Sequence, residues 1–347
     1  MSAYLNAIGS AVPQHDVHQE FLDWAAARVD RPDARLFARV ARRSGIERRW
    51  SVLPRTSFQT DRTGFYSAAS PGTAARMAIY AEAAPELSLA AVDALAARAD
   101  LTGVTHLVVA SCTGFVAPGL DQIVAARLGL PGSVERLLIG FMGCYAAVAA
   151  LRTARHLVRS EPQARVLVIA CELSTLHLQN TGDVESLLAM LQFGDGAAAA
   201  LVTAEAQGLE LGRPFAATLP DSGALIRWTI TDTGFAMHLS GEVPRRIATA
   251  LDDEAFRTVV TGGGRTVDRW AVHAGGRSIL DAVEQSLDLG PEALAASRAV
   301  LRDHGNMSSA TLMFVLERLM AGPAVGQGVA LAFGPGLAAE GFGFRGA

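Results

Sequence analysis

Three residues suited to acyl transfer each stand where a strand-like run meets a helix-like run. Cys144 lies between the apolar run LLIG and the helical pattern YAAVAALRTARHLVRS, His273 ends the run WAVH, and Asn306 opens NMSSATLMFVL. A cysteine at a helix amino terminus is expected to have a lowered thiol pKa, because the macrodipole and unpaired N–H groups stabilise the thiolate. Glycines beside Cys144 allow backbone N–H groups to face a developing oxyanion.

A cysteine, a histidine and an asparagine form a complete set for acyl transfer if they share one pocket. Ligand sites of open α/β sheets form at the carboxyl ends of strands, where all three junctions can meet. The thiolate would carry the acyl group, and His273 and Asn306 would donate to a thioester oxygen and to an enolate formed by decarboxylation. Each residue also has a structural interpretation, as a small buried thiol or a helix N-cap. For Cys112 and Cys171, inside strand runs, that interpretation is favoured.

The other histidines have weaker contexts. His106 is inside a strand run, His156 is in a helical pattern, and His15 and His18 are near the amino terminus. His304 precedes Asn306 closely and is a rival to His273, but its DHG context indicates an exposed turn.

The elements that position these residues follow an alternating pattern. Short apolar runs at 105–112, 135–140, 165–173 and 197–204 alternate with helical patterns, of which 145–160 is the clearest. Runs that are apolar on both faces predict a covered, largely parallel sheet. A strand, glycine turn and helix at 135–158 recur at 268–289, which suggests a duplicated α/β architecture, and 328–344 predicts a hairpin around a Gly-Pro-Gly turn.

Composition excludes several classes of protein. The 347 residues are 50% hydrophobic and carry a net charge of -4, so whole-molecule attraction to nucleic acid is not expected. No stretch is long and apolar enough for a membrane span, and no export signal is visible. Three cysteines without zinc-ligand spacing indicate a reducing compartment. We therefore expect a cytoplasmic protein with no metal site.

Five sequence blocks resemble the type III polyketide synthases, the chalcone and stilbene synthase family. They are GFMGCYAA, FGDGAAAALV, WAVHAGGRSIL, GNMSSATLMFVL and FGPGL, with weaker similarity at RRSGIERRW and ASCTGFVAPG. The resemblance implies an α/β, thiolase-like fold of duplicated αβαβα halves forming a five-layered core. Residues 1–207 would carry the nucleophilic cysteine and residues 208–347 the histidine and asparagine. It also implies a homodimer that condenses malonyl-CoA iteratively onto an acyl-CoA starter, without a further cofactor.

The same resemblance assigns roles to single residues. Cys144 matches the acyl-carrying nucleophile, His273 the histidine that activates it, and Asn306 the asparagine that assists decarboxylation. Phe193 matches an aromatic gatekeeper between the CoA tunnel and the cavity, and Met237 stands where the second gatekeeper is commonly phenylalanine.

Binding positions follow from the resemblance as well. Arg39 and Arg43 match two basic positions that hold CoA phosphates, although a basic surface helix face explains them too, and the third such position is Leu36. Trp228 replaces a small glycine of the cavity, and Ala117 replaces a larger residue that relatives insert across the dimer interface. The remaining implied positions are Gly275 and Gly276 for CoA, and Thr113, Ser174, His177, Ser308 and Gly334 for the cavity.

The segments ELSTLHLQ and GFMGCYAA look closest to bacterial alkylresorcinol and alkylpyrone synthases, so a fatty acyl starter is expected. Two alternatives stay open. One is a β-ketoacyl synthase III-type enzyme, which condenses once and takes malonyl from acyl carrier protein. The other is a catalytically silent scaffold subunit of a synthase complex.

Overall fold

A computed structural model describes residues 1–59, 64–66 and 70–347. Its main feature is a nine-stranded mixed sheet with the order β11-β12-β13-β8-β1-β7-β6-β4-β5. The amino-terminal part contributes β1 (Tyr4–Ala11), β4 (His106–Ser111), β5 (Glu135–Gly140), β6 (Val166–Leu173) and β7 (Asp195–Thr203). The carboxyl-terminal part contributes β8 (Leu209–Thr218), β11 (Arg269–Val272), β12 (Gly328–Gly334) and β13 (Ala338–Gly346). A short antiparallel contact of β1 with β8 joins the two parts.

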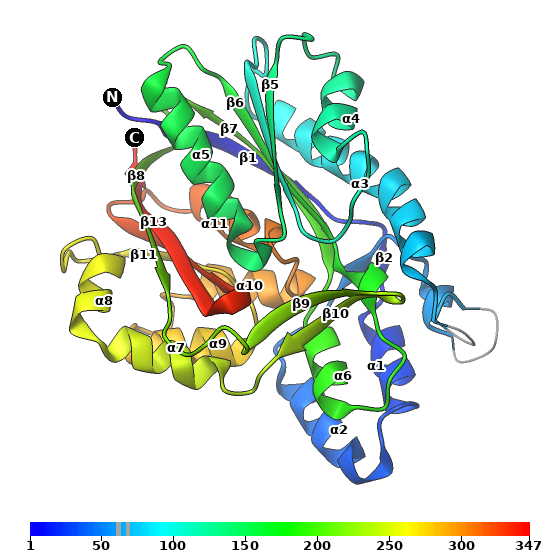
Figure 1. Cartoon of the computed structure of the whole chain (residues 1–347). Helices are drawn as coiled ribbons and strands as arrows, with labels where there is room; N and C mark the ends of the chain where they lie inside the picture. The colour runs from blue at the N-terminus through cyan, green and yellow to red at the C-terminus, as the bar shows by residue number, and fades with distance from the viewer. Residues whose placement is uncertain (60–63, 67–69) are drawn as a thin grey trace.

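Helices form three layers around this sheet. The central layer contains α5 (Ala146–Ser160) and α11 (Ala310–Met320), whose apolar side chains pack against strands of both sheet parts. One outer layer contains α3 (Thr73–Ala96) and α4 (Leu120–Arg127). The other is built around α7 (Val243–Asp252), α8 (Glu254–Val260), α9 (Arg277–Ser286) and α10 (Ala295–His304). The layers therefore alternate helix, sheet, helix, sheet, helix (Figure 1), which confirms the five-layered thiolase-like fold.

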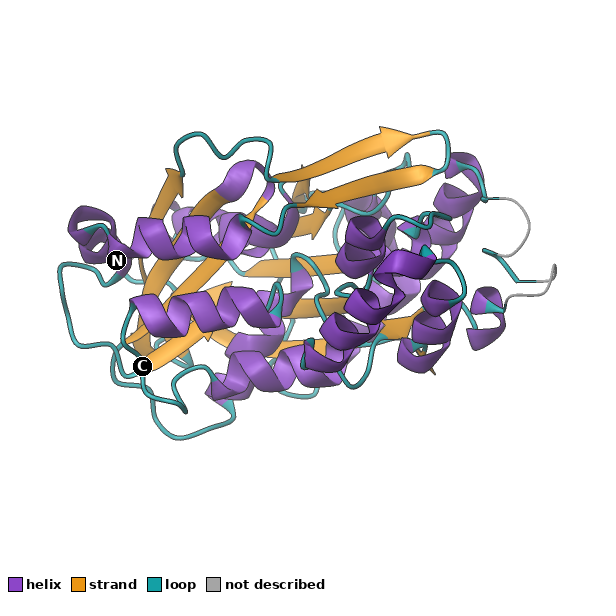
Figure 2. Cartoon of the chain, turned by 90° about the horizontal axis from the view of Figure 1, so that it is seen from below, coloured by secondary structure: helices purple, strands orange, loops and turns teal. Residues whose placement is uncertain are grey.

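Smaller elements gather at one end of the molecule. They include α1 (His18–Ala26), α2 (Ala34–Arg43) and α6 (Val184–Met190), with the short strands β2 (His15–Asp16) and β3 (Trp50–Ser51). The hairpin of β9 (Ile226–Thr231) and β10 (Gly234–Leu239) lies apart from the main sheet (Figure 2). Single helical turns are η1 (Arg31–Asp33), η2 (Arg55–Phe58), η3 (Gly143–Tyr145), η4 (Ser174–His177) and η5 (Pro335–Leu337).

The four predicted strands and the clearest predicted helix correspond to β4, β5, β6, β7 and α5. The predicted hairpin is also confirmed, because β12 pairs with β13 antiparallel from Gly328 and Phe344 to Gly334 and Ala338. The prediction of a largely parallel sheet is wrong. The pairs β4–β5, β4–β6 and β11–β12 are parallel, whereas β6–β7, β1–β7, β12–β13 and β13–β8 are antiparallel. Helices cover both faces whatever the strand direction, so continuous apolar runs do not reveal that direction.

Strand β5 corrects a second expectation, that every strand is covered on both faces. It lies at the sheet edge beside β4, and its side chains are mostly exposed, including Leu137 and Leu138 at 45% each. Among the described residues, no helix is both long enough and apolar enough to cross a membrane. The division at residues 207 and 208 stays a prediction.

Candidate active site

Cys144 lies in η3, between edge strand β5 and central helix α5. Two glycines allow the loop after β12 to pack directly on this turn. Gly143 has a φ of +71°, and a Cβ added there would lie 2.5 Å from Cδ of Pro335. A Cβ on Gly334 would lie 2.7 Å from Cδ1 of Tyr145 and 3.3 Å from the backbone N of Cys144. The blocks GFMGCYAA and FGPGL thus form one structural unit around the thiol.

The environment of Cys144 corrects the expectation of a stabilised thiolate. Burial, with a smaller contribution from the nearby Glu172 carboxylate, raises the pKa of this thiol to about 12, although hydrogen bonds from Ser308 and Asn306 oppose the shift. The sulfur lies 3.9 Å from the Ser308 hydroxyl oxygen. Loss of solvation is the largest contribution to this shift, so the thiol is protonated at neutral pH.

His273 lies directly after β11, where its backbone N–H donates to Leu331 O at 2.8 Å. The side chain is 1% exposed, and neither ring nitrogen has a hydrogen-bond partner among the described residues. Burial lowers the pKa of His273 to about 3, so the imidazole is neutral at physiological pH. A buried imidazole normally satisfies its nitrogens, and two unpaired ones indicate a site that a ligand completes.

Asn306 is tied to the segment of Phe193 by backbone pairing. Its N–H donates to Gln192 O at 2.7 Å, its carbonyl accepts from Gly194 N at 3.0 Å, and a β-bridge joins Phe193 with Asn306. The side-chain Nδ2 donates to Gly275 O at 3.3 Å, and Oδ1 accepts from Ser308 N at 2.8 Å. Helix α11 has Ser309 at its N-cap, so Asn306 is not the cap that the alternative interpretation required.

A cavity of about 20 Å³ lies beside Cys144, with room for about one water molecule. Its lining consists of Cys112, Thr113, Phe141, Gly143, Cys144, Ser174, Phe193, Trp228, Met237, Ser308 and Pro335. Seven of these residues were singled out from the sequence. Ala117 is exposed in this chain, and His177 and Gly334 stand behind the lining rather than in it. We refer to this space as the inner cavity.

Aromatic rings close one side of the inner cavity. Trp228 lies 6.4 Å from Phe193 and 6.0 Å from Phe235 between ring centroids, and its indole N–H donates to Cys112 O at 3.1 Å. Phe235 stacks on His177 at 4.1 Å. The neutral imidazole of His177 bonds Thr113 O at 2.7 Å and accepts from Phe235 N at 3.1 Å. The hairpin β9–β10 is therefore fixed against the wall, and Trp228 occupies space that a glycine would leave open.

Cys112 is buried, as predicted, but its sulfur also lines the inner cavity and accepts from Gly143 N at 3.0 Å. Glu172 was missed by the sequence analysis. Its buried carboxylate accepts from Cys112 N at 3.0 Å, Thr113 Oγ1 at 2.9 Å and Ser309 Oγ at 2.5 Å, and burial raises its pKa to about 7. A carboxylate inside the otherwise apolar run RVLVIACEL was the available signal.

A much larger cavity, which we call the outer cavity, has a volume of about 970 Å³ and lies between α2, α6, α9 and the end of β10. The four residues predicted to bind CoA, Arg39, Arg43, Gly275 and Gly276, all line it. Leu36 lines it as well, and Arg277 adds another guanidinium. Neither Arg39 nor Arg43 forms an ion pair with another described residue. Gln192 lines the outer cavity and the next residue, Phe193, lines the inner one, so the two spaces share a wall.

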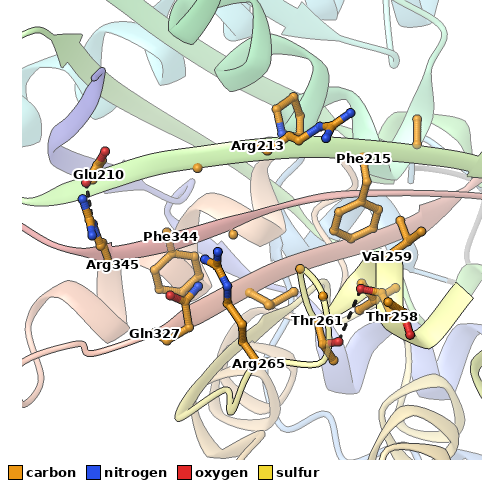
Figure 3. A pocket seen from close by; sticks show the side chains of 18 residues that line it. Glu210, Arg213, Phe215, Thr258, Val259, Thr261, Arg265, Gln327, Phe344 and Arg345 are labelled. Atoms are coloured by element: carbon orange, nitrogen blue, oxygen red, sulfur yellow. Dashed lines mark hydrogen bonds and ion pairs between the residues drawn. The ribbon is translucent and has the colours of Figure 1, made fainter. Parts of the chain in front are cut away.

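The position of His304 differs from the sequence prediction. His304 is not in an exposed turn, because it is the half-buried last residue of α10 and its Nδ1 accepts from Trp50 Nε1 at 3.1 Å. A third cavity of about 870 Å³ lies between β8, β13 and α8, with Phe215, Val259 and Arg265 among its lining residues (Figure 3). None of the sequence-predicted site residues lines it.

Two family models of the same protein family match the two parts of the chain. The model of the chalcone and stilbene synthases, N-terminal domain, matches residues 1–206, and that of the C-terminal domain matches residues 210–347. Bisdemethoxycurcumin synthase of Oryza sativa subsp. japonica is 34% identical, over 96% of this chain and 90% of the relative. Curcumin synthase 1 of Curcuma longa is 35% identical, over 68% of this chain and 66% of the relative.

Solved structures are similar over the full length. PKS-I from the brown alga Ectocarpus siliculosus has a TM-score of 0.90 at 28% identity, covering 100% of this chain and 98% of that one. The C-terminal type III polyketide synthase domain of Steely1 from Dictyostelium has a TM-score of 0.92 at 25% identity, covering 100% and 99%. The chain belongs to the chalcone and stilbene synthase family and is a type III polyketide synthase, an acyltransferase that uses acyl-CoA and malonyl-CoA.

Proposed function

We propose that Cys144 carries the acyl group and that His273 and Asn306 hold the thioester oxygen during decarboxylative condensation. The observation that carries this proposal is the buried His273 imidazole, whose two nitrogens lack partners in the described protein, in a fold that also buries Cys144 and Asn306. A neutral imidazole supplies one N–H donor and one acceptor. It can take the Cys144 proton in the loading step and donate to an oxygen in the later steps.

The steps balance without a redox or metal cofactor, and CoA thioesters are the substrates. The Cys144 sulfur attacks the starter carbonyl carbon, a C–S bond forms, and CoA leaves as its thiol with the proton. Malonyl-CoA then loses carbon dioxide, and the electrons of the broken C–C bond form an enolate that His273 and Asn306 stabilise. The enolate carbon attacks the Cys144 thioester, and the cysteine sulfur leaves. The lengthened chain is now a CoA thioester, and it returns to Cys144 as CoA leaves as its thiol. The next round or cyclisation follows.

The outer cavity is proposed to hold CoA. Arg39 and Arg43 offer guanidinium groups without carboxylate partners in the described structure, which suits phosphate groups. Gly275 and Gly276 present backbone without side chains on the way toward Phe193. A thioester entering from this side passes Gln192 and Phe193 before reaching Cys144. We propose the neutral inner cavity as the place where the malonyl carboxylate is lost.

The starter is proposed to be short or planar. The inner cavity has a volume of about 20 Å³ and is lined by the large rings of Trp228 and Phe193, and His177 and Phe235 pack against Trp228 from behind the lining. A fatty acyl starter, giving an alkylresorcinol or alkylpyrone, is the second candidate, favoured by the residues around Cys144 and by ELSTLHLQ. It requires the β9–β10 hairpin to move or the chain to pass another way. The curated relatives reported above are named for curcuminoids, not for alkylresorcinols.

Incubation of the protein with malonyl-CoA and a panel of starters tests both the condensation reaction and the proposed size of the starter. Acetyl-, benzoyl- and palmitoyl-CoA are compared, and products are identified by mass spectrometry. Polyketides formed with malonyl-CoA and no acyl carrier protein support the condensation proposal, and single-condensation products that require a carrier protein support the β-ketoacyl synthase III-type alternative. Preference for palmitoyl-CoA overturns the short-starter proposal alone, and absence of any product leaves the scaffold alternative.

We also propose a homodimer built on the exposed edge strand β5. Leu137 and Leu138 are 45% exposed, and Phe115 nearby is 52% exposed and stacks on Phe141 at 4.7 Å. An exposed apolar sheet edge normally needs a cover. Sedimentation equilibrium is expected to give twice the chain mass, and Leu137→Lys with Leu138→Lys is expected to give monomers.

Reducing conditions in the cytoplasm are the proposed setting, because all three cysteines are free.

A further inference from the structure

Arg49, in the block RRSGIERRW, is buried at the boundary of the two cavities, and neither the resemblance nor the proposed mechanism uses it. The side chain is 1% exposed. Its Nη1 donates to Phe193 O at 2.8 Å and to Met190 O at 3.1 Å, and its Nε bonds His18 Nδ1 at 3.1 Å. The guanidinium therefore holds two carbonyls of the turn that ends at Phe193.

The same side chain also contacts the segment that leads to Asn306. Gly305 has a φ of +68°, and a Cβ added there would lie 3.0 Å from Cγ of Arg49. Asn306 in turn pairs with the backbone on both sides of Phe193. Arg49 thus contacts both the segment of Phe193, the proposed gate, and the segment of Asn306, whose side-chain amide is proposed to bind the enolate.

Burying the charged guanidinium of Arg49 costs free energy that an apolar side chain filling the same space would not cost. A buried guanidinium loses its hydration, and here one nitrogen, Nη2, lacks a partner in the described structure. Burial lowers the pKa of Arg49 to about 9, against the carboxylates of Asp16 and Asp195, so the group remains charged at neutral pH. Its Cζ lies 4.3 Å from the Phe21 ring centroid, over the ring, which adds a cation–π contact.

We infer that Arg49 is a positioning residue that fixes Phe193 relative to Asn306, so that the malonyl carboxylate and the thioester oxygen are held in the geometry that decarboxylation needs. This inference rests on the proposed function. A fork that donates to the Phe193 carbonyl while its stem packs on Gly305 limits movement of both segments at once. An ammonium group cannot reproduce those paired contacts, because it is a compact charge on a flexible stem.

The test is Arg49→Lys, with malonyl-CoA decarboxylation measured in the absence of a starter. We expect kcat to fall about tenfold with KM within about twofold, because displacement of a positioned group lowers the rate rather than the affinity. Alkylation of Cys144 by iodoacetamide should keep its wild-type rate. The matched control is Arg76→Lys. Arg76 is also fully buried, and it donates to the carbonyls of Pro71, Leu176 and Leu178, which lie outside the segments of Phe193 and Asn306.

A purely structural role predicts a different pattern. Both arginine variants would then lose melting temperature and activity in parallel, with kcat per folded molecule unchanged, and the inference would be overturned. If Arg49→Lys does not fold, His18→Ala releases the Nε contact while leaving Arg49 in place, and kcat must still fall severalfold for the inference to stand. If the wild-type protein does not decarboxylate malonyl-CoA at all, the proposed function fails and the inference fails with it.

Discussion

The inner and outer cavities share a wall but differ in almost every physical property. The inner cavity has about 20 Å³ and a lining of neutral side chains, whereas the outer one has about 970 Å³ and exposed arginines from α2 and α9. The change occurs between adjacent residues, Gln192 and Phe193. On β10, Met237 faces the inner cavity and Leu239 the outer one. The protein thus separates a region suited to binding a multiply charged carrier from a region suited to losing a carboxylate.

The largest expected effect comes from removing the thiol of the inner cavity. Cys144→Ala should lower polyketide formation by about a thousandfold or more, because no acyl-enzyme can form. Carbon dioxide release from malonyl-CoA should continue, since the proposed mechanism assigns that step to His273 and Asn306. Cys171→Ala is the matched control, because that buried thiol lines neither cavity. Polyketide formation by Cys144→Ala would refute the nucleophile assignment.

Removing the charges of the outer cavity should affect affinity and leave the chemical step nearly unchanged. For the double variant Arg39→Ala with Arg43→Ala, we expect the KM of malonyl-CoA to rise about a hundredfold or more, since each of the two charge-assisted bonds to phosphate contributes roughly 1.5–3 kcal/mol. The kcat should change little. Arg42→Ala, on the same helix but outside the cavity lining, is the control. Equal KM values in all three proteins would place CoA elsewhere.

Opening the aromatic wall should change which starters are used. Trp228→Gly removes an indole from the inner cavity and should raise the use of palmitoyl-CoA relative to acetyl-CoA by about tenfold, because each accommodated methylene group contributes to binding. Ile230→Ala changes an exposed residue of the same strand and should leave this ratio unaltered. Unchanged starter preference in Trp228→Gly would show that the chain of the starter does not pass this wall.

The smallest expected effect concerns Glu172, whose charge raises the pKa of Cys144. In the Glu172→Gln variant, iodoacetamide should alkylate Cys144 about threefold faster than in the wild-type protein at pH 8. The reason is that removal of a nearby negative charge makes the Cys144 thiolate easier to form. At pH 6 the two proteins should react alike, because the wild-type carboxyl, with a pKa of about 7, is then mostly protonated. A rate ratio that does not change between pH 6 and pH 8 would contradict this electrostatic coupling.

Glu172 also gives a stability test with a defined sign. Its pKa rises from 4.5 to about 7 on folding, so its contribution to stability is full below pH 4.5 and is lost as the pH rises through 7. The melting temperature of the wild-type protein should therefore fall relative to that of Glu172→Gln across this interval. Thermal unfolding at several pH values measures the difference.

Sequence patterns predicted most elements around the site. The helix at 145–160, the strand runs and the terminal hairpin follow from periodicity and turn residues, which act locally. Strand direction and the exposure of β5 did not follow, because both depend on which elements pack beside a strand. The lowered thiol pKa expected for Cys144 was wrong for the same reason, since the helix terminus is a local feature and desolvation is set by the whole fold.

The amino-acid sequence by itself determined the family, the layered fold and the residue types available for acyl transfer. Only the tertiary structure decided that Trp228, packed against His177 and Phe235, lines the inner cavity. It also decided that Glu172 lies close enough to affect Cys144 and that Arg49 bridges the segments of Phe193 and Asn306. These contacts join residues far apart in the chain. Their effects depend on burial and on distances of a few ångströms, which no local pattern encodes.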